Sequence, residues 1–242
     1  MNNFSETPSR PALIDSTTIL IIDDEPAIRR AVVSALASNE MRVLEAGTAT
    51  RGLELATTEH PALFLVDLGL PDGTGLDVCQ QLRRRTAAPI VVLSAGYAES
   101  QKVALLEAGA DDYVSKPFGM RELQARVDAH LRRAHIRLYA APSVFEVDGL
   151  TIDLPRSIVM RESRHIRLTP TEWCILTVLA RRAGRPVTHE EIFAAVWGQR
   201  FGDSSLYLRV YLTHLRRKIE RNPSQPRVIT TEPGIGYRLR HE

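Results

Sequence analysis

The chain has 242 residues, 44% of them hydrophobic, which is enough to bury one large core or two ordinary ones. It holds no apolar run of about 18 residues, so we expect no membrane-spanning segment, and its polar start lacks the apolar core of a signal peptide. Its two cysteines lie far apart, which excludes a disulfide framework and favours a reducing, cytoplasmic location.

The charge is divided unevenly along the chain. The formal net charge is +2, yet residues 18–134 carry 13 Lys and Arg against 16 Asp and Glu, whereas residues 143–242 carry 16 against 11. An acidic front half and a basic rear half indicate two domains, the second of which faces a polyanion. We expect a mobile extension at 1–17, a first domain at 18–134, a linker at 135–143 and a second domain at 144–242.

Strands and helices alternate five times in the first domain. Each expected strand is rich in β-branched or apolar residues, and each precedes a segment with apolar residues at helical spacing. This alternation predicts an α/β fold with a doubly wound parallel sheet. The expected strands are 18–22, 42–45, 63–67, 89–93 and 112–115, and the helices cover about 27–38, the segment before 60, 75–85, 100–108 and 120–133.

The ends of these strands deliver five polar side chains to one edge of the sheet: Asp23, Asp24, Asp67, Ser94 and Lys116. Three neighbouring carboxylates repel one another, which favours a site for a hard cation such as Mg²⁺. Lys116 and Ser94 suit the oxygens of a phosphoryl group, so Asp67 is a candidate nucleophile that forms an acyl phosphate. The alternative, that all five are solvated loop residues, stays open.

The same residues resemble the motif set of a response-regulator receiver domain, which has a flavodoxin-like fold. The matching positions are Asp23 and Asp24, Asp67 with Pro71 and Gly75, Ser94, and Lys116 with Pro117. The resemblance implies Mg²⁺ held by Asp23 or Asp24, by Asp67 and by the backbone carbonyl of Gly69. It implies phosphate taken from a sensor histidine kinase, and a switch in which Ser94 moves toward the phosphate while Tyr113 turns inward.

The run at 108–118 resembles the OmpR/PhoB subfamily, whose active form dimerises through the fourth helix, fifth strand and fifth helix. One departure is that Glu107 and Asp128 are both acidic where opposite charges are expected. Because an exposed ion pair contributes only about 0–1 kcal/mol, this change weakens the interface without abolishing it. The alternative is that these charged faces are simply solvated. The residues that match the family's charged pairing partners are Lys102, Asp111, Asp112, Glu122, Arg126 and Arg133.

The second domain is expected to hold short strands, three helices and a terminal hairpin. Its first helix has a cap at Thr169, Pro at the first position and an acid in the first turn. The third helix sets basic side chains beside an apolar stripe, and the hairpin turns at Pro233-Gly234. The expected strands are 145–147, 150–153, 158–160 and 164–167, the helices run from 169 to 184, 190 to 196 and 204 to 221, and the hairpin covers 227–239.

Helices followed by a hairpin resemble the OmpR/PhoB winged helix-turn-helix. In that family the third helix enters the major groove of double-stranded promoter DNA and the wing meets the minor groove, which combines base-edge and phosphate contacts. The loop 198–203 matches one that contacts RNA polymerase in relatives. Pro233 stands at a wing position that is often basic, which weakens the expectation of a phosphate contact there. The candidate DNA contacts are Arg209, Thr213, His214, Arg216, Arg217 and, on the wing, Arg238.

Together these features predict a DNA-binding transcription regulator, not an enzyme, that forms a homodimer when phosphorylated on Asp67. Residues 67–73, 115–126, 207–209 and 233–238 further resemble the branch of the family that regulates potassium-uptake genes. One alternative is a regulator that binds DNA without phosphorylation. A second, an aspartyl-nucleophile phosphohydrolase, is disfavoured because such enzymes need an acid two residues after the nucleophile and position 69 is glycine.

Overall fold

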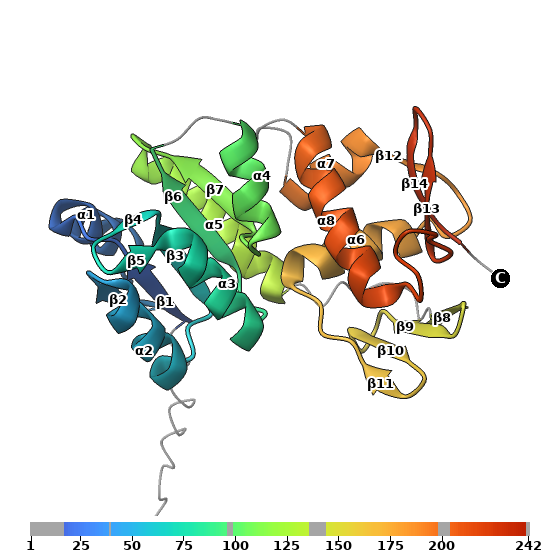
Figure 1. Ribbon diagram of the computed structural model, residues 1–242, viewed down its shortest axis with the longest axis horizontal. Helices are drawn as coiled ribbons and strands as arrows, with labels where there is room; N and C mark the ends of the chain where they lie inside the picture. Colours follow the sequence, from blue (N-terminus) through green and yellow to red (C-terminus); the bar gives the residue numbers. More distant parts are fainter. Residues whose placement is uncertain (1–16, 39, 96–98, 136–143, 198–203, 241–242) are drawn as a thin grey trace, which may run out of the picture.

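The computed structural model describes residues 17–38, 40–95, 99–135, 144–197 and 204–240 (Figure 1). Residues 1–16 of the expected extension, residues 136–143 of the expected linker and the loop 198–203 lie outside these ranges. So does the side chain of Arg133, one of the predicted dimer-face groups. Within the described ranges, no helix combines the length and apolar composition needed to cross a membrane.

The first domain is built on a five-stranded parallel sheet with the strand order β2-β1-β3-β6-β7 (Figure 1). This confirms the predicted doubly wound α/β fold. A short antiparallel hairpin of β4 and β5 follows β3. The strands are β1 (Thr17–Ile22), β2 (Met41–Ala46), β3 (Leu63–Asp67), β4 (Gly69–Leu70), β5 (Gly73–Thr74), β6 (Ile90–Ser94) and β7 (Asp112–Ser115), and the helices are α1 (Pro26–Leu36), α2 (Ala49–Glu59), α3 (Gly75–Arg85), α4 (Glu99–Glu107) and α5 (Met120–His135).

The sheet is buried on both faces, which explains why its strands read as nearly continuous apolar runs. Alternate side chains of β1 point to opposite sides, so Ile19 and Ile21 pack on one face while Leu20 and Ile22 pack on the other. Helices α1 and α5 cover the first face, and α2, α3 and α4 cover the second. This layering brings the carboxyl ends of all five strands to one edge of the sheet.

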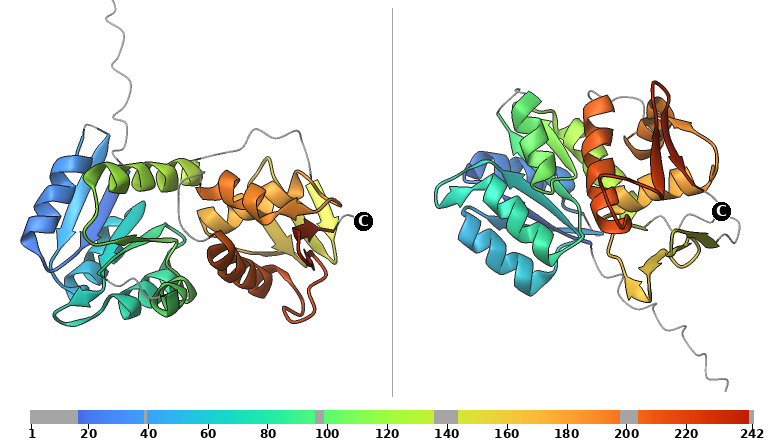
Figure 2. Two further views of the ribbon diagram at one scale, coloured as in Figure 1. Left: turned by 90° about the horizontal axis from the view of Figure 1, so that it is seen from above. Right: turned by 45° about the vertical axis from the view of Figure 1, so that its right-hand side comes forward.

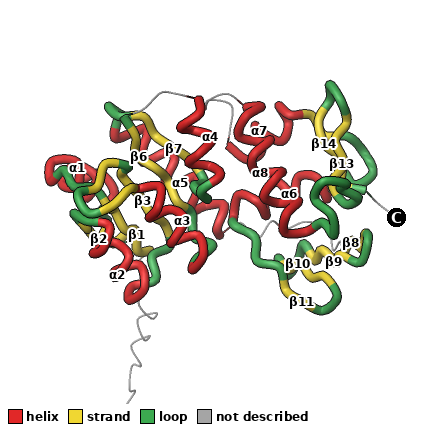
Figure 3. The backbone as a smooth tube through the Cα atoms, viewed as in Figure 1, coloured by secondary structure: helices red, strands yellow, loops and turns green. Residues whose placement is uncertain are grey.

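The second domain joins an antiparallel sheet, three helices and a small terminal sheet (Figure 3). The terminal sheet has the order β12-β14-β13, so the expected hairpin has a third strand that the sequence did not reveal. The strands are β8 (Val144–Val147), β9 (Leu150–Asp153), β10 (Ile158–Arg161), β11 (Arg164–His165), β12 (Val187–Thr188), β13 (Ile229–Glu232) and β14 (Gly236–Leu239), and the helices are α6 (Pro170–Ala180), α7 (His189–Trp197) and α8 (Ser204–Ile219).

Local chemistry fixes the ends of these elements. Helix α6 begins with the expected cap: the Thr169 hydroxyl accepts from the Glu172 N–H, and the Glu172 carboxylate accepts from the Thr169 N–H. Gly234 has φ +73° at the hairpin turn. A Cβ at Gly236 would lie 2.0 Å from the carbonyl oxygen of Val187, so only glycine allows β14 to approach β12.

The two domains pack against each other along α4 and α8, which lie side by side (Figures 1 and 2). The ring of Tyr113 on β7 stacks on that of Tyr207 on α8, with centroids 5.6 Å apart. The Tyr211 hydroxyl donates to the carbonyl of Ala110 at 3.0 Å. Leu106 of α4 completes the hydrophobic core of the second domain. The third helix of the second domain therefore rests on the face predicted to dimerise.

Candidate phosphoacceptor pocket and nucleic-acid interface

Three strands bring Asp23, Asp67 and Lys116 together at the carboxyl edge of the parallel sheet. The ammonium Nζ of Lys116 lies 2.6 Å from Asp67 Oδ1, 3.0 Å from Asp23 Oδ2 and 3.3 Å from Glu25 Oε1. Asp23 is fully buried and Asp67 is 6% exposed. Of the five side chains predicted at this edge, Asp23, Asp67 and Lys116 are in contact, because the ends of parallel strands converge.

The charges in this pocket perturb one another. Burial raises the pKa of Asp23, and its hydrogen bond with Lys116 only partly offsets the effect. Burial lowers the pKa of Lys116, but hydrogen bonds to Asp67 and Asp23 outweigh this and raise the pKa overall. Lys116 is thus a permanent cation held against two carboxylates, where it can balance additional negative charge on Asp67.

The loop after β3 holds the Asp67 side chain in place. The N–H of Gly69 donates to Asp67 Oδ2 at 2.6 Å. A Cβ at Gly75 would lie 2.1 Å from the carbonyl oxygen of Asp67, so the chain can turn back here only with glycine. Ser94, which is 2% exposed, ends β6 and pairs in register with Ser115 on β7. These contacts explain why the motif needs glycine eight residues after the aspartate.

Acidic side chains at the end of β1 offer oxygen ligands for a cation. One ligand oxygen each from Asp23, Asp24 and Glu25 lies within 4.8 Å of the others. Hard divalent cations such as Mg²⁺ prefer such carboxylate oxygens, so the donor set fits the group that the sequence predicted. Glu25 was not among the predicted residues; its adjacency to the acid pair was the only signal.

The predicted dimer-face charges are mostly paired within the chain. Arg126 Nη1 contacts both carboxylate oxygens of Asp112 at 3.1 and 2.9 Å, and Arg126 Nη2 contacts Glu122 at 2.9 Å. Burial favours protonated Asp112, but hydrogen bonds from His130 and the charge of Arg126 outweigh it and lower the Asp112 pKa. These groups would have to change partners to pair between subunits, so the dimer face stays a prediction.

Two further members of this predicted face lie next to the second domain. Asp111 is 1% exposed and forms an ion pair with Arg83 of α3. The Lys102 ammonium lies 4.8 Å from the centroid of the Tyr113 ring, the same ring that stacks on α8. In this arrangement the domain contact and the predicted dimer contact use the same surface.

Helix α8 distributes the predicted DNA contacts over different faces. Arg209, Thr213 and Arg217 are exposed, whereas His214 is half-buried and turns toward the first domain. Burial lowers the pKa of His214. Arg216 points instead at the wing, where it donates to the backbone carbonyl of Ile229 at 2.8 and 3.0 Å.

The wing carries the remaining predicted contact. Arg238 Nε lies 2.9 Å from Glu232 Oε1 on the neighbouring strand, so it is engaged in an ion pair along the wing. Ile235 at the wing tip is 49% exposed and is one of the large apolar side chains left open to solvent. The wing therefore presents an apolar tip next to a partly neutralised arginine.

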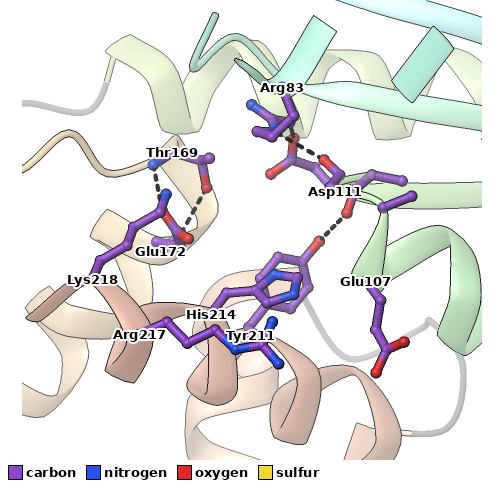
Figure 4. Close-up of a pocket in the computed structure, with 12 residues that line it drawn as sticks. Arg83, Glu107, Asp111, Thr169, Glu172, Tyr211, His214, Arg217 and Lys218 are labelled. Atoms are coloured by element: carbon purple, nitrogen blue, oxygen red, sulfur yellow. Dashed lines mark hydrogen bonds and ion pairs between the residues drawn. The ribbon is translucent and has the colours of Figure 1, made fainter. Parts of the chain in front are cut away.

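A cavity of about 240 Å³ lies between the two domains, beside the α4–α8 contact (Figure 4). Four of the charged groups in its walls are paired: Arg83 with Asp111, and Lys218 with Glu172, whose nearest charged atoms are 2.6 Å apart in the second pair. Glu107 and Arg217 also line the cavity, and neither forms an ion pair with another described residue. Tyr211 reaches across beside the cavity to the Ala110 carbonyl. Sequence reasoning missed Tyr207 and Tyr211; their one-turn spacing on α8, beside the apolar stripe, was the available signal.

Comparison with known proteins matches both domains. Residues 19–128 match the family described as "Response regulator receiver domain", and residues 163–239 match "Transcriptional regulatory protein, C terminal". The chain is 46% identical to the KDP operon transcriptional regulatory protein KdpE of Escherichia coli (strain K12), over 92% of this chain and 99% of that protein. It is 45% identical to KdpE of Mycobacterium tuberculosis (strain CDC 1551 / Oshkosh), with the same coverage. The crystal structure of DrrB, a Thermotoga maritima OmpR/PhoB homolog, superposes with a TM-score of 0.51 at 28% identity and covers 93% of this chain and 99% of its own.

Proposed function

Because the chain belongs to the OmpR/PhoB-type response regulators, we propose that it is a transcription regulator switched by transfer of a phosphoryl group from a sensor histidine kinase to Asp67. The observation that carries this proposal is the contact between Lys116 Nζ and Asp67 Oδ1 at 2.6 Å, on an edge that also holds Asp23. This arrangement positions a carboxylate nucleophile beside a cation suited to a phosphoryl group.

We assign the residues of the pocket separate roles in the transfer of the phosphoryl group. An oxygen of Asp67 attacks phosphorus as the P–N bond to the kinase histidine breaks, and the electron pair of that bond returns to the imidazole. Lys116 then contacts the new phosphoryl oxygens in place of the free carboxylate. Mg²⁺, held by Asp23 or Asp24, by Asp67 and by the Gly69 carbonyl, would neutralise charge on the phosphoryl group.

Ser94 and Tyr113 connect the pocket to the second domain. Ser94 lies at the end of β6, beside β7, and its hydroxyl is proposed to move toward the phosphoryl oxygens. Tyr113 lies on β7 and stacks on Tyr207 of α8. Inward rotation of Tyr113 would remove that stack, so phosphorylation would weaken the domain contact. Because this contact covers the predicted dimer face, its release would also allow dimerisation.

The DNA-binding role follows from the second domain. We place α8 in the major groove of promoter DNA and the β13–β14 wing in the adjacent minor groove, with RNA polymerase contacting the loop at 198–203. Two dimerised copies raise each other's effective concentration on paired half-sites. The relatives named KdpE, one of them after the KDP operon, support potassium-transport genes as the target.

Selection of genomic fragments by the protein, with and without a small-molecule phosphodonor and Mg²⁺, tests this function. We expect phosphorylation to enrich direct-repeat sites upstream of potassium-transport genes. Enrichment at other promoters would overturn the potassium assignment alone. If no fragment were enriched in either state, the DNA-binding proposal itself would be wrong.

The Asp67→Ala variant tests the switch separately from the target. Without the carboxylate no acyl phosphate can form, so we expect the phosphodonor to induce no dimers in sedimentation experiments. Asp72→Ala is a suitable control, because its carboxylate accepts from the backbone of α2 and lies outside the pocket. Donor-induced dimers of Asp67→Ala would contradict the proposed switch.

A further inference from the structure

The wing is tied to α8 by two side chains of opposite charge, Arg216 and Glu220. Arg216 lies in the last turn of α8, and Glu220 directly follows the helix, where its N–H still donates to the Arg216 carbonyl at 2.9 Å. The Glu220 carboxylate, only 7% exposed, accepts hydrogen bonds from the N–H groups of Arg227, Val228 and Ile229 at 2.8–3.0 Å. Arg216 donates Nε and Nη2 to the carbonyl of Ile229 at 3.0 and 2.8 Å. Together the two side chains bind three backbone N–H groups and one backbone carbonyl at the start of β13.

Arg216 also makes contacts further along the wing. Its Nη2 donates to Thr231 Oγ1 at 2.9 Å, and its guanidinium carbon lies 5.6 Å from the centroid of the Tyr237 ring. Thr231 and Tyr237 face each other across β13 and β14, and Tyr237 also faces Val187 of β12. One guanidinium group therefore connects α8 to two strands of the three-stranded wing sheet.

The other arginines of α8 differ from Arg216 in this respect. Arg209 and Arg217 are exposed, and within the described part of the chain their side chains make no hydrogen bond or ion pair. Arg209 is available to an incoming phosphate or base in this arrangement, and Arg217, which lines the cavity between the domains, would become available once the domains separate. Arg216 has only Nη1 without a hydrogen bond to the described residues, since Nε and Nη2 are engaged by the wing. Burial lowers its pKa, which agrees with a guanidinium partly withdrawn from water.

We propose that Arg216 serves DNA binding as a positioning residue: with Glu220 it fixes the wing relative to α8 so that both reach adjacent grooves of one duplex. The inference rests on the proposed DNA-binding function. A wing that moved freely against the helix would have to be immobilised on binding, and that ordering would cost affinity. Arg216 therefore acts through the wing, and the direct contacts to DNA come from its exposed neighbours.

Salt dependence separates a positioning arginine from a phosphate-contacting one. The probe is the duplex most strongly enriched by phosphorylated wild-type protein, and Arg216→Gln is compared with Arg217→Gln, which removes the same charge one residue away. Losing one phosphate contact should flatten the plot of log affinity against log salt by about 1. We expect this for Arg217→Gln. For Arg216→Gln we expect about tenfold weaker binding with an unchanged slope, as ordering of the wing is added to the cost of binding.

Two further measurements, hydrogen exchange and footprinting, report on the wing itself. In the free protein, backbone hydrogen exchange at 229–239 should be faster in Arg216→Gln than in wild type or Arg217→Gln. On DNA at saturating protein, Arg216→Gln should keep its minor-groove protection at the wing flank in hydroxyl-radical footprints, because the wing still binds once the cost of ordering it has been met. Arg216→Lys should restore slow exchange and affinity in part, because an ammonium can donate to the Ile229 carbonyl but cannot also span Thr231 and lie on Tyr237.

A reduced salt slope for Arg216→Gln would overturn the inference and make Arg216 a direct contact. Hydrogen exchange at 229–239 as slow as in wild type would also overturn it, because the wing would then be held without Arg216. If Arg216→Gln does not fold, Arg216→Lys carries the same comparison with a smaller expected change. Failure of wild-type protein to enrich any DNA would reject the proposed function instead. The hydrogen-exchange comparison would still test whether Arg216 holds the wing against α8, because that measurement needs no DNA.

Discussion

At the scale of single residues, the acidic pocket favours ligand binding over stability. Asp23 is fully buried beside Asp67, and burial raises its pKa. A raised pKa means that the folded state disfavours the ionised carboxylate relative to the unfolded chain, whose Asp pKa is about 3.9. The destabilisation is absent at low pH, develops as the pH rises from the unfolded-state pKa towards the raised pKa of the folded state, and is fully present above the latter. Lys116 offsets part of it through its hydrogen bond.

The Asp23→Asn variant should therefore unfold at a higher temperature than wild type in metal-free buffer at pH 7. The amide removes the buried charge but keeps a similar shape. Added Mg²⁺ should raise the wild-type midpoint and have a smaller effect on the variant, because ligand binding stabilises only the folded state that can bind it. Asp24→Asn serves as the control, since Asp24 is exposed and should change the metal-free midpoint little. A lower midpoint for Asp23→Asn would show that its pairing with Lys116 outweighs its burial.

At the scale of elements, the connection from β3 to α3 determines where the carboxylate of Asp67, the proposed phosphoacceptor, points. Gly75 begins α3 at a point where a Cβ would lie 2.1 Å from the Asp67 carbonyl and 2.7 Å from the Cα of Leu68. Backbone atoms cannot yield as a flexible side chain can, so any other residue must displace the loop that carries Asp67. The glycine of this motif is thus needed for close approach of two backbone segments.

We expect Gly75→Ala to slow phosphorylation of Asp67 by a small-molecule donor by at least tenfold, since a displacement of about 1 Å can cost about 100-fold in a positioned reaction. Acyl phosphate formed over time measures the rate. Gly73→Ala is the matched control two residues away, because a Cβ there meets the Cβ of Ala49 at an ordinary 3.5 Å. Equal rates for the two variants would mean that the loop absorbs the added methyl group without moving Asp67.

The sequence was informative about elements wherever a pattern repeats. Strand–helix alternation predicted the parallel sheet, and convergence of its strand ends predicted that Asp67 and Lys116 meet, which the structure places 2.6 Å apart. Strand β12 was missed because two residues are too few to show any periodicity. Arg216 was predicted to contact DNA on its charge alone, since the carbonyl that it binds lies 13 residues away and leaves no local signal.

At the scale of the whole molecule, the contact between domains could not be predicted, because it joins residues about a hundred positions apart. The Tyr211 hydroxyl donates to the Ala110 carbonyl, and Tyr207 stacks on Tyr113. Neither Tyr207 nor Tyr211 belongs to a sequence motif that would indicate a contact with the first domain. Their contacts place α8 on the face that carries Lys102, so the closed arrangement of the domains covers the surface at which two copies are predicted to pair.

The Tyr211→Phe variant should shift the unphosphorylated protein toward separated domains. It removes one buried hydrogen bond, worth about 0.5–1.5 kcal/mol, and leaves the ring in place, so the ratio of open to closed forms should rise about two- to tenfold. A larger radius of gyration in small-angle scattering, without phosphodonor, measures this change. Thr213→Val is the control, because its hydroxyl donates to the Arg209 carbonyl on its own helix. An unchanged radius for Tyr211→Phe, together with unchanged dimerisation after phosphorylation, would mean that this contact does not hold the domains closed and that the switch must act elsewhere on the α4–α8 surface.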